Sequence, residues 1–144
     1  MEEGPAKRFC SELIIEGREV VGIRGDPRDI TNIVIPNGID GITDGVFEDC
    51  WGLTAVTLPD PVPSVGKGEF QRCTGLTSVT LPTTLTLIGG YTFSICGLTS
   101  LTLPDNVKDV GESAFLECWD LTSLTLSKNL TSIGAHAFKD SNLT

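Results

Sequence analysis

Apolar residues recur along the chain with a period of 22 to 23 residues from position 30 onward. Each period opens with the pattern L-x-x-[VL]-x-L, whose alternating end is typical of a short strand. Its three apolar columns are Ile30, Leu53, Leu76, Leu98 and Leu121; Ile33, Val56, Val79, Leu101 and Leu124; and Ile35, Leu58, Leu81, Leu103 and Leu126. Because a fixed period of this length is the signature of a solenoid, the pattern predicts five stacked repeats.

A turn is predicted directly after each strand. Four repeats have proline there and the fifth has serine: Pro36, Pro59, Pro82, Pro104 and Ser127. Proline has no N–H to donate, so the strand ladder ends at this point. Apolar columns continue at Ile39, Val62, Leu85, Val107 and Leu130, at Ile42, Val65, Ile88, Val110 and Ile133, and at Phe47, Phe70, Phe93, Phe115 and Phe138. This stretch is too short for a regular helix, so we expect short 3₁₀ or irregular turns.

The predicted fold is a repeat solenoid with a parallel β-sheet on its concave face, short turns on its convex side and an N-terminal β-hairpin cap. We expect a flexible N-terminus over 1–8 and the hairpin with its connector over 9–29, turning near Glu16-Gly17. The repeats are predicted at 30–52, 53–75, 76–97, 98–120 and 121–142, with a partial repeat at 143–144. Since no cap sequence follows, either the chain is a fragment of a longer array or this edge pairs with another copy or a partner.

The repeat Leu76-Thr-Ser-Val79-Thr-Leu81-Pro82, followed by Ile88-Gly89, Phe93 and Cys96, resembles the BspA-like, or Treponema-type, leucine-rich repeats of bacterial surface proteins and protist proteins. The resemblance covers residues 30 to 144. It implies an adhesion or recognition module with a binding surface, located at the cell surface or secreted. The N-terminus lacks the basic start and apolar stretch of a secretory signal, which indicates a cytoplasmic protein if the chain is complete as given.

Composition narrows the class of partner. The chain has 19 acidic residues against 10 Lys and Arg, a net charge of −9, which repels a phosphate backbone and argues against nucleic acid. Its apolar runs are far shorter than the roughly 20 residues of a membrane-spanning helix, so no membrane span is expected. The apolar fraction of 40% suits one folded unit with a continuous core.

The residues that could carry chemistry are explained by the repeat, so no catalytic, cofactor or metal site is predicted. The sole histidine, His136, lies between two alanines and is expected in a solvated loop. Four cysteines recur at the repeat period, which favours a buried, reduced ladder over a zinc site: Cys50, Cys73, Cys96 and Cys118. Cys10 lies outside this ladder, in the cap. Asn129 and Asn142 begin glycosylation sequons that the repeat itself explains, and their use stays open.

The candidate binding surface is the outward side of the predicted sheet, a neutral face of Ser and Thr. Its proposed contact residues are Ser78, Thr80, Ser100, Thr102, Ser123 and Thr125, and two candidate anchors, Trp51 and Trp119, occupy the loop edge. Since two repeats lie between the tryptophans, one small ligand would not touch both. Repeat two is a second candidate, with Lys67, Glu69 and Arg72.

The predicted function is non-enzymatic binding of a macromolecule, with protein as the main partner and glycan as the alternative. A structural segment of a longer repeat or surface assembly protein is the competing interpretation. Under this interpretation the Ser and Thr face is a soluble sheet surface without a partner, since β-branched threonine is a good strand former. An ice-binding threonine array is a minor alternative, against which the curvature of the fold argues. Self-association through the uncapped C-terminal edge is a further candidate.

Overall fold

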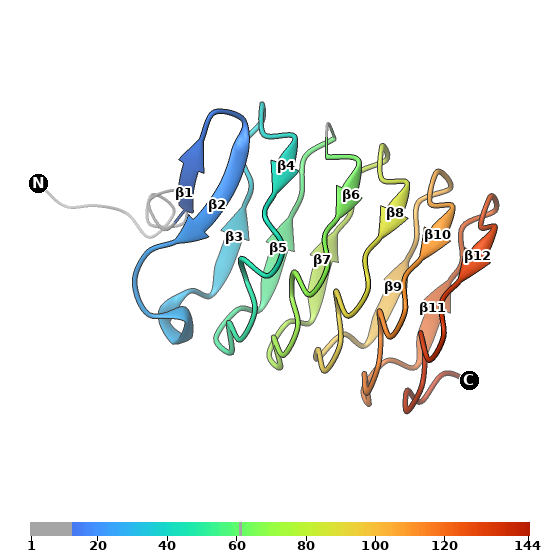
Figure 1. Ribbon diagram of the computed structural model, residues 1–144. Coiled ribbons are helices and arrows are strands. Elements are labelled where there is room, and N and C mark those ends of the chain that lie inside the picture. Colours follow the sequence, from blue (N-terminus) through green and yellow to red (C-terminus); the bar gives the residue numbers. More distant parts are fainter. Residues whose placement is uncertain (1–12, 61) are drawn as a thin grey trace, which may run out of the picture.

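The chain winds into a solenoid whose coils stack along one axis, so that residues 22 or 23 positions apart lie side by side (Figure 1). The structure is a computed structural model that describes residues 13–60 and 62–144. We number the coils by their sequence repeats: coil one is 30–52, coil two 53–75, coil three 76–97, coil four 98–120 and coil five 121–142. The fold class predicted from the sequence is confirmed. The expected flexible segment 1–8, Cys10 and the start of the hairpin lie outside the described residues.

The first strand of each coil lies where the apolar alternation predicts it. These strands are β3 (Asn32–Val34), β5 (Ala55–Thr57), β7 (Ser78–Thr80), β9 (Ser100–Thr102) and β11 (Ser123–Thr125). Their middle residue turns inward and its neighbours turn outward, as the period of two requires. The strands pair in parallel, and residues of the same column lie opposite one another. Val56, for example, pairs with Ile33 on one side and with Val79 on the other.

A second ladder of two-residue strands lies on the other side of the coils. Its members are β4 (Gly41–Ile42), β6 (Ser64–Val65), β8 (Leu87–Ile88), β10 (Asp109–Val110) and β12 (Ser132–Ile133). Only turns were predicted here, and this ladder was not, because two residues show no alternation. Its strands exist only through hydrogen bonds to the next coil, as β8 pairs with β6 and β10.

The stretch from the second strand to the cysteine forms the expected turns. In coil one, the N–H groups of Val46 and Cys50 donate to carbonyls three residues back, on Thr43 and Phe47, at 3.3 Å each. This spacing is that of a 3₁₀ turn. The sequence expectation is therefore correct for this part of the coil.

A β-hairpin covers the first coil, as predicted. β1 (Leu13–Glu16) and β2 (Glu19–Ile23) pair antiparallel, and Gly17 in the turn has a φ of 64°, which glycine adopts without strain. β2 then pairs parallel with β4, so that the hairpin extends the second ladder. Val20 of β2 is fully buried against the stack. A short 3₁₀ helix, η1 (Pro27–Asp29), leads into β3.

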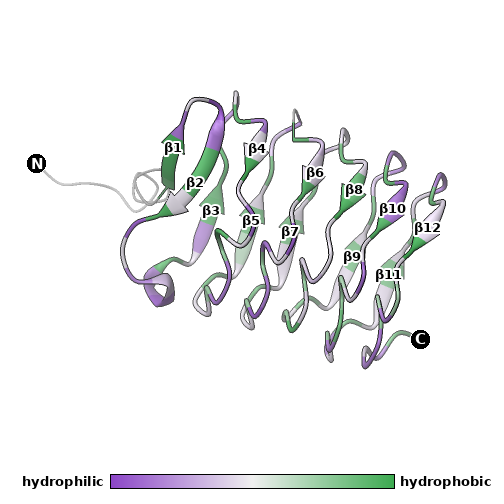
Figure 2. Cartoon of the chain, viewed as in Figure 1, coloured by the Kyte–Doolittle hydropathy of each residue, from purple (hydrophilic) through white to green (hydrophobic). Residues whose placement is uncertain are grey.

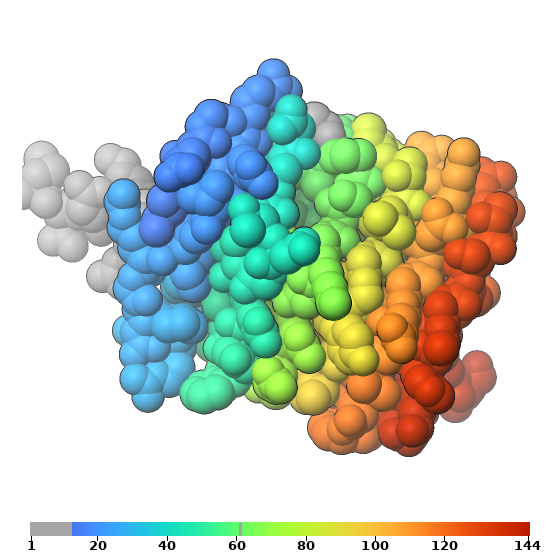
Figure 3. Space-filling view, viewed as in Figure 1, coloured from blue at the N-terminus to red at the C-terminus, as the bar shows by residue number. Residues whose placement is uncertain are grey.

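The core is built from columns of identical residues. The phenylalanine rings stack along the axis, with centroids 5.3 to 5.6 Å apart from Phe47 through Phe115, and 5.4 Å between Phe115 and Phe138. The four ladder cysteines are buried and free, as predicted. The coils lie in contact along the stack (Figure 3), so each column is continuous.

Two residues assigned to the core by their columns are exposed instead. Leu126 and Ile133 of the last coil are 46% and 47% exposed, whereas their equivalents Leu103 and Val110 in coil four are buried. The reason is that each column is covered by the coil on either side, and in this structure no further coil packs on the outer side of coil five. The prediction that these two positions are core residues is wrong here.

Candidate functional site

The predicted binding face is an exposed, hydroxyl-rich surface. All six strand residues proposed as contacts are exposed: Ser78, Thr80, Ser100, Thr102, Ser123 and Thr125. In Figure 2 strands β7, β9 and β11 are largely pale, the colour of residues that are neither strongly polar nor strongly apolar. The face therefore carries hydrogen-bonding groups without charge.

The hydroxyls at the margin of this face are used within the protein, whereas those on the face are not. Thr54 donates through Oγ1 to the carbonyl of Thr31, in the preceding coil, at 2.9 Å. The hydroxyls of Thr77 and Thr122 likewise donate to the carbonyls of Thr54 and Thr99 at 3.4 Å. In the described part of the chain, the six face hydroxyls have no such partner. They are free to donate to or accept from another molecule.

The face is interrupted between coils three and four. β3, β5 and β7 form one sheet and β9 and β11 another, and among the described strands β7 does not pair with β9. The second ladder continues past this point, because β8 pairs with β10. The break therefore separates Ser78 and Thr80 from the contact residues of β9 and β11.

The break follows coil three, one of the two repeats of 22 residues. Between the ladder cysteine and the next strand leucine, coil two has Thr74 and Gly75, whereas coil three has Gly97 alone. The amide of Thr77 donates to Thr54 at 3.1 Å, whereas within the described residues the amide of Thr99 has no equivalent bond. Coil five also has a single residue here, Asn142, yet the equivalent amide bond is present, from Thr144 to Thr122 at 3.2 Å. The short linker therefore accompanies the break but does not by itself cause it.

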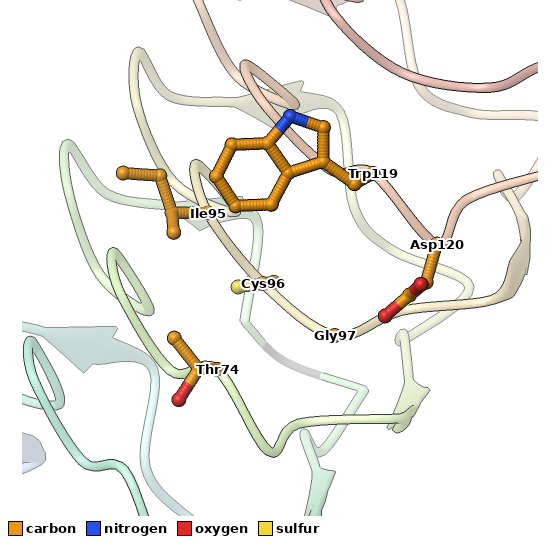
Figure 4. Close-up of a pocket in the computed structure, with 6 residues that line it drawn as sticks. All are labelled: Thr74, Ile95, Cys96, Gly97, Trp119 and Asp120. Carbon is orange, nitrogen blue, oxygen red and sulfur yellow. The ribbon is translucent and has the colours of Figure 1, made fainter.

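A groove of about 200 Å³ opens at the loop edge beside the short linker of coil three. Six residues of coils two, three and four line it: Thr74, Ile95, Cys96, Gly97, Trp119 and Asp120. In Figure 4 the indole of Trp119 lies over the groove next to Ile95, and Asp120 lies at one end. Trp119 keeps 54% of its surface exposed. This tryptophan thus forms one wall of a concave site.

Trp51 is equally exposed, at 53%, but does not line this groove. It belongs to coil one, and coils two and three separate it from Trp119. The structure therefore separates the two candidate anchors, as the sequence spacing indicates.

Ile95, on the floor of the groove, has an unfavourable backbone conformation. Its φ is 57°, in the left-handed region that β-branched residues rarely adopt. The same backbone position in the other coils is charged: Asp49, Arg72, Glu117 and Asp140. All five coils have a positive φ at this position, so the conformation belongs to the repeat. Ile95 was not among the predicted site residues, although its column shows one apolar residue among four charged ones.

Two of the charged residues of coil two, the second sequence candidate, are engaged within the protein. Arg72 is paired with Glu48 at 3.2 Å and with Asp49 at 3.8 Å. Glu69 is buried, and its Oε2 accepts a hydrogen bond from the Val46 amide at 3.0 Å while Oε1 has no partner. Burial raises the pKa of Glu69 to about 8, so this carboxyl holds its proton at neutral pH.

The side chains with nucleophilic or ligand chemistry are placed as the repeat predicts. His136 is exposed in its loop. Burial raises the pKa of Cys50 and of Cys118 to about 11, so these thiols stay protonated and unreactive. Within residues 13–60 and 62–144, no group of three or more His, Cys, Asp or Glu side chains is arranged to hold a metal ion. The described residues also include no helix of the length and apolar character that a membrane crossing requires.

Comparison with known proteins identifies the repeat. The family model described as BspA type leucine-rich repeat region matches residues 40–144 in six copies. A leucine-rich repeat protein from Bacteroides ovatus superposes with a TM-score of 0.75 at 31% identity, over 78% of this chain and 30% of that one. The T. pallidum leucine-rich repeat protein gives a TM-score of 0.79 at 28% identity, over 99% of this chain and 70% of that one.

The pneumococcal vaccine antigen PcpA shares the fold alone, at 20% identity and a TM-score of 0.64, over 91% of this chain and 40% of that one. The chain thus spans less than a third of the Bacteroides protein. A search of curated proteins found no match.

Proposed function

Because this chain belongs to the family of BspA-type leucine-rich repeat proteins, we propose that it is a non-enzymatic interaction module that binds a protein through its strand face and loop edge. The fold supports this role because stacked coils present an extended, rigid surface of the kind that repeat proteins use for binding.

The observation that carries the proposal is the difference between the two sets of hydroxyls. If the Ser and Thr pattern served the sheet alone, the face hydroxyls would bond between coils as those of Thr54 and Thr77 do. They instead point outward without protein partners. A neutral face of free hydroxyls beside an exposed tryptophan has the polar and aromatic groups that protein interfaces favour.

The same face argues against ice binding. An ice surface requires a flat and regular array of hydroxyls, whereas the rows of this chain are interrupted between β7 and β9. Protein partners tolerate such an interruption because their own surfaces are irregular.

The test is affinity capture of the partner with the double variant Ser100→Arg, Thr102→Arg. Both residues are exposed on β9, so the substitutions should leave the fold intact and block the face with bulk and charge. The partner recovered with the wild-type protein is purified and its affinity measured by calorimetry. We expect at least about a tenfold loss of affinity, which corresponds to 1.4 kcal/mol.

The matched control is Leu87→Arg, Ser132→Arg, which adds the same charge to exposed positions of the second ladder. The control should bind as the wild-type protein does. Equal binding by the β9 variant would refute the strand face as the site. Digestion of the partner with protease or with glycosidase before capture distinguishes a protein ligand from a glycan.

A structural segment that assembles with copies of itself is the second candidate function. It is favoured by the exposed Leu126 and Ile133 of coil five, which lie on strand ends available for pairing. Its test is the oligomeric state, which we consider at the scale of the whole molecule below.

A further inference from the structure

We propose that the groove under Trp119 receives a positively charged side chain, lysine or arginine, of the protein partner. This inference rests on the proposed protein-binding function and specifies the chemistry of the residue that the loop edge recognises. It is carried by the size of the groove, its charge, its aromatic wall and the apolar Ile95 beside that wall.

The size of the groove suits a single side chain. Its volume of about 200 Å³ lies below the roughly 300–1,000 Å³ of sites that enclose a small-molecule ligand. The groove lies where coil three has a single residue, Gly97, between Cys96 and Leu98. Gly97 cannot fill the gap, because a Cβ there would lie 2.5 Å from the carbonyl oxygen of Thr74. Position 97 therefore contributes no side chain to the groove.

The charge around the groove is negative and unpaired. The carboxylate of Asp120 lies at one end of the groove (Figure 4), and within the described part of the chain neither it nor Glu117 is in an ion pair. Arg72 of coil two is already held by Glu48 and Asp49. A cationic side chain would supply the missing partner for Asp120.

The aromatic wall adds a second attraction for a cation. The face of an indole attracts ammonium and guanidinium groups, and tryptophan does so best among the aromatic residues. Ile95 supplies an apolar contact for the aliphatic stem of such a side chain. The groove thus offers a surface for the stem, an aromatic face and a carboxylate for the charged head.

The same groove offers fewer hydrogen-bonding groups than a sugar requires. In Figure 4 the indole nitrogen of Trp119 points away from the groove, which leaves the hydroxyl of Thr74 and the carboxylate of Asp120 as its polar side-chain groups. Several hydroxyls of a sugar ring would then stay without hydrogen bonds, which disfavours binding. The charged head of lysine or arginine forms its strongest hydrogen bonds to a carboxylate, which Asp120 supplies.

The experiment uses the pentapeptide acetyl-Gly-Gly-Arg-Gly-Gly-amide and its glutamine counterpart as probes. Binding is followed by the NMR shift of the indole N–H of Trp119, in a Trp51→Phe background that leaves one tryptophan. We expect saturable shifts at Trp119, Ile95 and Gly97 with the arginine peptide at low salt, and about fivefold weaker binding of the glutamine peptide. A peptide with lysine should behave as the arginine peptide does.

Asp120→Asn tests the carboxylate and Glu112→Gln is its control. Both remove one negative charge, and Glu112 is exposed but does not line the groove. Asp120→Asn should lower the affinity for the arginine peptide about fivefold, whereas Glu112→Gln should leave that affinity unchanged. Trp119→Ala should abolish the shifts at Ile95 and Gly97, with circular dichroism reporting whether the coils remain folded.

Three results would overturn the inference: equal binding of the glutamine peptide, equal weakening by Glu112→Gln, or binding of neutral oligosaccharides such as chitobiose in place of the arginine peptide. Each leaves the proposed function standing if the Ser100→Arg, Thr102→Arg variant still loses its partner. If the Ser100→Arg, Thr102→Arg variant keeps its partner while the arginine peptide still binds, the strand face is refuted as the binding site. The inference about the groove would then still stand.

Discussion

At the scale of single residues, a thiol and a carbonyl connect neighbouring coils. The Sγ atoms of Cys73, Cys96 and Cys118 donate to the phenylalanine carbonyl of the preceding coil at 2.9 to 3.0 Å. Ser141, which takes the place of a fifth cysteine, donates within its own coil to Phe138 at 2.9 Å. The cysteine column thus combines burial with the hydrogen bond that a buried carbonyl needs, which explains its recurrence without any metal or redox role.

Phe93→Ala should cost about 3–5 kcal/mol of unfolding free energy, because it removes a fully buried ring from the middle of the stack. Urea unfolding followed by circular dichroism measures the loss. Phe138→Ala is the matched control, since Phe138 is only partly buried and stacks on one ring, Phe115. We expect a smaller loss there, and a Phe93 variant as stable as the wild-type protein would contradict the core assignment.

Glu69 makes the stability of the protein depend on pH. Burial raises the pKa of its carboxyl from 4.5 to about 8. The folded state therefore keeps a proton that the unfolded state has lost, and the stability contributed by this group falls as pH rises from about 4.5 to about 8. Glu69→Gln keeps an oxygen for the amide of Val46 and removes the titration.

The unfolding midpoint in urea should consequently fall more steeply from pH 5 to pH 9 in the wild-type protein than in Glu69→Gln. Glu112→Gln, at an exposed position, should follow the wild-type profile. Parallel profiles for the wild-type protein and Glu69→Gln would show that Glu69 is ionised in the folded state.

At the scale of the elements, a break in one sheet does not divide the solenoid. The first ladder is interrupted between β7 and β9, but the second ladder pairs β8 with β10 and the rings of Phe93 and Phe115 remain stacked at 5.5 Å. The coils therefore tolerate a change of length on the side of the first ladder, because the second ladder and the phenylalanine column keep their register. The groove under Trp119 lies at the same place in the stack, beside Gly97.

Hydrogen exchange should reveal the interruption. The amides of Thr77 and Thr122 donate to the preceding coil at 3.1 and 3.0 Å, and the amide of Thr99 has no such acceptor in the described structure. We expect the amide of Thr99 to exchange at least about tenfold faster than those two, since its opening needs no broken bond. Equal protection of the three amides, measured by NMR, would show that the ladder is continuous in solution.

At the scale of the whole molecule, coil five presents apolar surface that the other coils bury. Leu126 and Ile133 are 46% and 47% exposed at the open end of the two ladders. Exposed strand edges with apolar side chains tend to pair. We therefore expect the 144-residue chain to form dimers at high protein concentration.

Light scattering at increasing concentration measures this self-association, and Leu126→Lys with Ile133→Lys should keep the chain monomeric because like charges would meet at the interface. Leu87→Lys, another exposed apolar position but on β8 within the stack, is the control and should leave the dimer intact. A strictly monomeric wild-type chain would contradict the second candidate function.

The sequence by itself determined the repeat, its first strand, the hairpin cap and the inward columns. The reason is that, at a period of 22 or 23 residues, only one alignment of the repeats places apolar residues in the same columns. It also identified the exposed face residues, since strand residues alternate between the two sides of a sheet. These features depend on local pattern, and the structure confirms them except at Leu126 and Ile133 of coil five.

Only the tertiary structure decided the second ladder, the interruption between β7 and β9, the burial of Glu69 and the groove under Trp119. Each depends on what the neighbouring coil places opposite a residue, which pattern along the chain does not state. The length of coil three was visible in the sequence, but whether a groove would open beside its short linker depended on the packing of three coils. The hydroxyls of Thr54 and Ser100 likewise look alike in sequence, and only the position of the next carbonyl distinguishes the structural one from the one that is free to bind.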